Sequence, residues 1–145
     1  MDALRIWDNE YSCLIEDAIF FEDNSFSKIS GNWKDGFKVD PPKPTSAIKS
    51  EGWSSLYPLL EGRSTFHIAI AGEASWGGTG FVALKKSDQP GFIWLIHLST
   101  MNNPVEVKIK NELVYLKSDL NYPDGVTFVI PINQPELFYA SHLPQ

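Results

Sequence analysis

The second half of the chain has a hydrophobic period of two, the spacing of a β-strand with one buried face. Bulky apolar residues alternate with small or polar ones over 65–71, which predicts a strand there. Two further runs, 81–85 and 92–98, flank a turn-rich segment and predict an antiparallel hairpin. The second run is apolar at nearly every position, so we expect a central strand that is covered on both faces.

Alternation resumes at 105–110 and 113–117, on either side of Asn111 and Glu112. A two-residue loop at this point predicts a hairpin with four apolar residues on one face. The opposed pairs would be Ile109 with Val114 and Val107 with Leu116.

Turn residues precede another expected strand at 126–130, and 135–139 predicts a final half-turn. The aromatic residues at strand positions are expected in the core: Phe66, Phe92, Trp94 and Phe128.

The first half of the chain has a less uniform pattern. Five apolar residues near the N-terminus match the spacing of one helical face, although residues 18–21 are equally compatible with a strand: Tyr11, Leu14, Ile15, Ala18 and Ile19. Glycines and prolines interrupt 25–53, which predicts irregular or edge structure held by aromatic residues. A serine cap followed by Pro58 in the first turn predicts a short helix ending at Gly62.

These elements predict an α+β fold that is mainly β. We expect five to seven mostly antiparallel strands in a curved sheet, a sandwich or a partly open barrel, with one or two short helices in the N-terminal half. The chain has 145 residues, which predicts a single globular domain over 1–145. One cysteine, Cys13, excludes an intramolecular disulfide framework, and no basic and apolar leader opens the chain, so a cytoplasmic location is expected.

Charge changes this picture most. The formal net charge is -6, which argues against nucleic acid and anionic membranes as partners and favours a basic protein. Residues 1–24 contain seven acidic residues against Arg5 alone, so they account for the whole excess. The segment could be a solvated face or a neighbour of the lysine-rich stretch 28–49. It could also be an acidic docking surface, formed by Asp8, Glu10, Glu16, Asp17, Glu22 and Asp23, with Trp7 and Trp76 as anchors.

Two histidines, His67 and His97, offer an enzyme hypothesis, because adjacent strands could bring both rings beside Glu73 or Asp119. The alternative is that each ring is a hydrogen-bonded part of a β-sheet. No metal-ligand spacing is present, and we expect neither a metal nor another cofactor. Gly31-Asn32-Trp33 matches the G-x-W of lipocalin-like barrels, which leaves a small-ligand-binding β-barrel as a further alternative, although prolines at 41–44 interrupt the strand pattern.

Three stretches of the C-terminal third resemble the small acidic immunity proteins of bacterial polymorphic-toxin and contact-dependent inhibition systems. They run from Trp94 to Pro104, from Asp119 to Pro123 and from Phe128 to Ile132. This resemblance implies a non-catalytic protein that neutralises a cognate toxin domain by binding it, and it transfers no specific residues. A toxin that attacks nucleic acid needs a cationic surface, for which an acidic inhibitor can compete.

Overall fold

Antiparallel strands make up most of the regular structure. The computed structural model describes residues 4–7, 10–13, 15–48, 54–74, 79–101, 103–120 and 123–141, the first two ranges by their backbone alone. Two short 3-10 segments are the helical elements of these ranges, η1 (Thr45–Ala47) and η2 (Pro135–Leu137). The strands in chain order are β1 (Leu4–Trp7), β2 (Glu10–Cys13), β3 (Ala18–Phe21), β4 (Ser25–Asn32), β5 (Gly36–Val39), β6 (Lys43–Pro44), β7 (Ser54–Arg63), β8 (His67–Ala74), β9 (Gly80–Lys86), β10 (Phe92–Leu98), β11 (Pro104–Lys110), β12 (Leu113–Ser118), β13 (Val126–Pro131) and β14 (Tyr139–Ser141).

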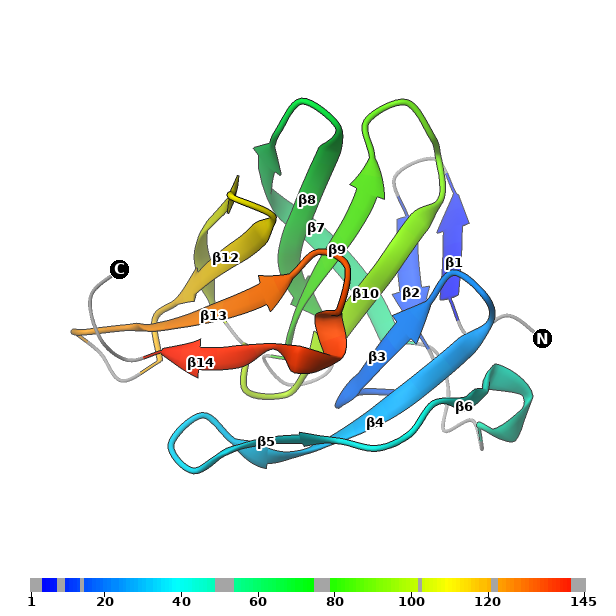
Figure 1. Cartoon of the computed structure of the whole chain (residues 1–145), viewed down its shortest axis with the longest axis horizontal. Helices are drawn as coiled ribbons and strands as arrows, with labels where there is room; N and C mark the ends of the chain where they lie inside the picture. The colour runs from blue at the N-terminus through cyan, green and yellow to red at the C-terminus, as the bar shows by residue number, and fades with distance from the viewer. Residues whose placement is uncertain are drawn as a thin grey trace.

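The strands form two antiparallel sheets (Figure 1). The larger has ten strands in the order β1-β2-β7-β8-β9-β10-β3-β4-β5, with β6 paired to β4. The smaller has the order β11-β12-β13-β14. The expected mainly β, antiparallel architecture is therefore confirmed, but the expected number of five to seven strands was too low. Strands that the N-terminal half contributes to the larger sheet account for the difference.

The main core lies between the two sheets. On the larger sheet the side chains of Val82 and Ile96 face this layer, and on the smaller sheet those of Leu116 and Phe128 do, all fully buried. A second buried cluster, which includes Phe20, lies on the opposite face of the larger sheet. Strand β10 therefore has apolar neighbours on both faces, as its continuous apolar sequence predicts.

Both predicted hairpins form, and the one closed by Asn111 and Glu112 has the expected register. Strand β10 pairs with β9, and β11 pairs with β12 so that Ile109 is opposite Val114. The loop residues Asn111 and Glu112 both have positive φ, at 53° and 64°, as in a type I′ turn. This turn type matches the right-handed twist of the two strands that it joins.

The helices predicted in the N-terminal half are absent from the described residues. The segment expected to form a helix after residue 53 is strand β7, in which buried Ser54 and Leu56 alternate with exposed Ser55 and Tyr57. The apolar stripe at 11–19 is divided between β2 and β3, because the chain turns at Asp17, whose φ is 55°. The alternative prediction of a strand at 18–21 is therefore confirmed. Edge strand β5 agrees with the irregular or edge structure expected over 25–53, but the expectation was wrong for β4, a regular strand of eight residues that lies between β3 and β5.

Phe66 was wrongly expected in the core. It lies in the turn between β7 and β8 and is 73% exposed. The alternation of apolar residues extends from β8 back into this turn, where the strands are no longer paired. Trp94 and Phe128 are fully buried as expected, and Phe92 is partly buried.

Candidate functional site

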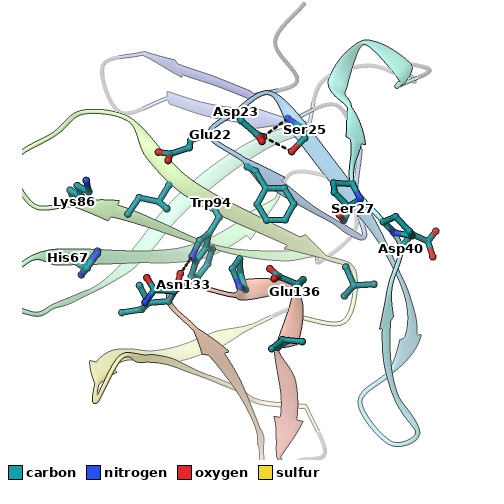
Figure 2. A pocket seen from close by; sticks show the side chains of 18 residues that line it. Glu22, Asp23, Ser25, Ser27, Asp40, His67, Lys86, Trp94, Asn133 and Glu136 are labelled. Atoms are coloured by element: carbon teal, nitrogen blue, oxygen red, sulfur yellow. Dashed lines mark hydrogen bonds between the residues drawn. The ribbon is translucent and has the colours of Figure 1, made fainter.

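An open groove of about 850 Å³ lies where the two sheets diverge (Figure 2). Its walls come from five places: the end of β3 with the following turn, the start of β4, the last residue of β5 with residues 40–42 after it, strand β10, and residues 132–137 around η2. The ends of β8 and β9 add His67 and Lys86 at one end of the groove. Because these segments are far apart in sequence, only the fold assembles the groove.

The floor of the groove is apolar and fixed in place. Trp94 is 1% exposed, and its Nε1–H donates to the Ile132 carbonyl at 2.9 Å, which links the larger sheet to the chain after β13. Pairing of β10 with β9 is irregular between Phe92 and Trp94. This irregularity brings two consecutive residues, Ile93 and Trp94, to the groove. Phe21 and the 58% exposed Leu137 also belong to the apolar lining.

Four exposed carboxylates line the groove: Glu22, Asp23, Asp40 and Glu136. We call them the rim carboxylates. Lys86 is the one lysine or arginine among the lining residues. Both ion pairs formed within the described ranges lie elsewhere, at Arg63–Glu61 and Lys108–Glu106. The rim carboxylates therefore leave the groove with an excess of negative charge.

The β3–β4 turn holds two of the rim carboxylates in a defined place. The Glu22 backbone N–H donates to the Ile93 carbonyl at 3.1 Å, which ties the turn to β10. Asp23 accepts hydrogen bonds from the backbone N–H and the hydroxyl of Ser25. Asn24 follows with a φ of 64°, a conformation that asparagine tolerates better than most residues. The turn thus presents Glu22 and Asp23 toward the groove (Figure 2).

The structure distributes the acidic residues of the N-terminal segment over different places. Glu22 and Asp23 line the groove, whereas Glu16 and Asp17 precede the other end of β3. Asp17 is held by the protein itself, because its Oδ1 accepts hydrogen bonds from the backbone N–H and the hydroxyl of Ser99, both at 2.8 Å. The Glu16 carbonyl accepts from the Lys28 ammonium at 2.9 Å.

The other predicted contact residues cannot be placed in the same way. Asp8 and Trp76 lie outside the described residues, and Trp7 and Glu10 belong to β1 and β2, of which the backbone alone is described. Sequence analysis missed Asp40 and Glu136. Asp40 is in a lysine-rich stretch and Glu136 is more than a hundred residues from Glu22, so no local sequence signal connects them.

His97 is part of the buried structure. Its side chain is 1% exposed, and Nδ1 lies 3.1 Å from the Ile15 carbonyl, which can only accept. Nδ1 therefore carries the proton, and Nε2 of the neutral ring accepts from the Thr79 hydroxyl at 2.8 Å. Burial lowers the pKa of His97, against the opposing effects of the Ile15 carbonyl and the charge of Asp17.

The predicted arrangement of His67 and His97 beside one carboxylate does not form. His97 is opposite Phe81 on β9, and Phe81 is opposite Gly72 on β8, five residues from His67. Glu73 is on β8, separated from β10 by β9, and Asp119 follows β12 in the other sheet. His67 lies at the end of the groove beside Lys86 (Figure 2).

Within the described ranges, no group of three or more histidine, cysteine, aspartate or glutamate side chains is arranged to hold a metal ion. None of the helical segments in those ranges has the length and apolar character to cross a membrane. Comparison of the chain with protein-family models, with curated proteins and with solved structures gave no match.

Proposed function

We propose that this chain is a non-catalytic inhibitory protein-binding domain of the immunity-protein class, which neutralises a basic bacterial toxin by binding it. The observation that carries the proposal is the groove, in which four exposed carboxylates surround an apolar floor. Apolar surface that is held open to water beside charged groups is typical of a site that a partner covers.

Charge determines which class of partner the groove favours. The rim carboxylates outnumber Lys86 four to one, and the whole chain has a net charge of -6. A cationic protein surface is therefore attracted at long range, and an anionic macromolecule is repelled. A toxin that acts on nucleic acid has such a cationic surface, so covering it would also prevent substrate binding.

The proposal is tested with the protein encoded by the reading frame adjacent to the gene for this chain. We expect that protein to arrest bacterial growth and co-expression of this chain to restore growth. Absence of growth arrest, or arrest that this chain does not relieve, contradicts the proposal.

Charge variants then test whether the groove is responsible. In the first variant the rim carboxylates become amides: Glu22→Gln, Asp23→Asn, Asp40→Asn and Glu136→Gln. The matched control makes the same change at four exposed acids of the smaller sheet and its flanking loops: Glu106→Gln, Glu112→Gln, Asp119→Asn and Asp124→Asn. Both variants lose four negative charges, so a difference between them isolates the position of the charge.

The readout is the association rate constant for the purified pair. We expect the rim variant to associate about tenfold more slowly than the control at low salt, and the rate for the native chain to fall as salt rises. Equal rates for the two variants, or a rate that is independent of salt, would contradict electrostatic capture at the groove.

A further inference from the structure

We infer that the groove binds one short extended segment of the partner, which places an aliphatic or aromatic side chain against Phe21, Ile93 and Leu137 above the buried Trp94 and arginine or lysine side chains against the rim carboxylates. This inference rests on the proposed function, which supplies the basic partner protein. It adds the chemistry of the bound segment and the part of the groove that each of its side chains contacts.

The floor calls for an apolar side chain. Leu137 is 58% exposed, and Phe21 and Ile93, which line the same groove, are half-buried, so all three keep apolar surface that a partner could remove from water. Two hydrogen bonds join the floor to its walls, one from the Trp94 indole N–H to the Ile132 carbonyl and one from the Glu22 backbone N–H to the Ile93 carbonyl. A floor that is already fixed loses little conformational entropy when a ligand covers it.

The rim calls for basic side chains on either side of that apolar residue. Figure 2 shows Glu22 and Asp23 above Trp94, Glu136 below it and Asp40 toward the far end of the groove from His67. The carboxylates therefore surround the floor rather than gather at one point. Long, flexible arginine and lysine side chains can reach such positions from neighbouring residues of an extended segment.

The size of the groove limits the occupant to a short segment. A volume of about 850 Å³ matches the space that a few side chains fill, so the part of the partner that enters the groove is a short segment that protrudes from its surface. The binding element is therefore an exposed loop or terminus of the partner. Lys86 is the one lining residue whose charge opposes a basic segment, and it is exposed.

Because Lys86 repels a basic segment, a change of its charge should raise the affinity of the groove for such a segment, which provides a test. The probe is a labelled peptide with blocked ends, in which a central leucine has two arginines on each side. We expect Lys86→Glu to raise its affinity about threefold to fivefold over the native chain, measured by fluorescence anisotropy at low salt. The matched control is Lys110→Glu, an exposed lysine on β11 outside the groove, which changes the net charge equally. Equal gains in the two variants would overturn the inference, because the net charge alone would then explain binding.

A second test addresses the apolar floor. Serine in place of the central leucine should lower the affinity of the peptide about tenfold, the effect expected for loss of one buried aliphatic side chain. Leu137→Ser should weaken the leucine peptide and leave the serine peptide unchanged, whereas Val105→Ser, at an exposed valine outside the groove, should weaken neither. If spermine, a polycation without an apolar side chain, binds as tightly as the leucine peptide, the floor has no role and the inference is wrong.

The two proposals fail in different experiments. If the toxin associates with the native chain in a salt-dependent manner while the leucine and serine peptides bind equally, the binding function stands and the anchored segment is wrong. If the leucine peptide binds as described but no basic partner is neutralised, the groove chemistry stands and the inhibitory function is wrong.

Discussion

The neutral, buried state of His97 has a direct consequence for stability against pH. The ring is 1% exposed, and burial lowers its pKa in the folded protein below the ordinary value of 6.5. In the unfolded chain the ring takes up a proton as the pH falls through 6.5, but in the folded chain it resists protonation. Stability is therefore present above pH 6.5 and is lost as the pH falls below it.

The size of this effect follows from linkage. If the folded ring stays neutral, the unfolded state gains about 1.4 kcal/mol from protonation of His97 between pH 7.5 and pH 5.5. The suitable comparison is His97→Asn, because the asparagine amide can still donate to the Ile15 carbonyl but does not titrate. All other titrating groups occur in both proteins, so their effects cancel in the difference.

The assay is urea unfolding of both proteins at several pH values in this range, followed by tryptophan fluorescence. We expect the native chain to lose up to about 1.4 kcal/mol more than His97→Asn, although the variant is less stable at pH 7.5 because it loses the Thr79 hydrogen bond. Parallel losses in the two proteins would refute the reasoning, because the folded ring would then accept a proton as readily as the unfolded one.

Two further predictions concern the backbone. A Cβ on Gly72 would overlap the Tyr57 carbonyl oxygen, so Gly72→Ala should lower the free energy of unfolding by about 3 kcal/mol or more. The control is Gly91→Ala, whose Cβ would meet no atom within 4 Å and which should change the free energy of unfolding by less than about 0.5 kcal/mol. Equal effects of the two substitutions in urea unfolding would contradict this packing. Glu112 has a φ of 64° in its hairpin turn, so Glu112→Gly should raise the free energy of unfolding by about 0.5–1 kcal/mol, and a lower melting temperature in calorimetry would show that the turn has another conformation.

Of the hairpins between strands that are adjacent in the chain, the sequence predicted β9–β10 and β11–β12 but missed β1–β2, β3–β4, β4–β5 and β7–β8. The hairpin β11–β12 is closed by two residues, so the alternation of apolar positions determined its register, including the pair Val107 and Leu116. Strand β3 pairs with the next strand, β4, and also with β10, more than seventy residues away, and β2 pairs with β7. Pairings between distant strands leave no pattern in the local sequence. The apolar spacing at 11–19, taken by itself, resembled that of a helix.

The sequence predicted the part of the candidate site that comes from one acidic segment, but not the parts that distant segments contribute. Excess negative charge near the N-terminus drew attention to Glu22 and Asp23, which line the groove. The expectation of a surface made only from that segment could not include Asp40 or Glu136, because the fold alone brings them to Trp94. The histidines attracted attention through their chemistry, but the strand register separates them.

The most direct test of the account is to locate a bound basic peptide by nuclear magnetic resonance. The arginine-flanked leucine peptide is titrated into the isotope-labelled chain while its backbone amide and indole N–H resonances are followed. We predict concentration-dependent shifts at Glu22, Ile93, Glu136 and the Trp94 indole, with little change on β11 and β12. Shifts centred on those two strands, or none at the groove, would contradict the claim that the acid-rimmed groove is the binding site.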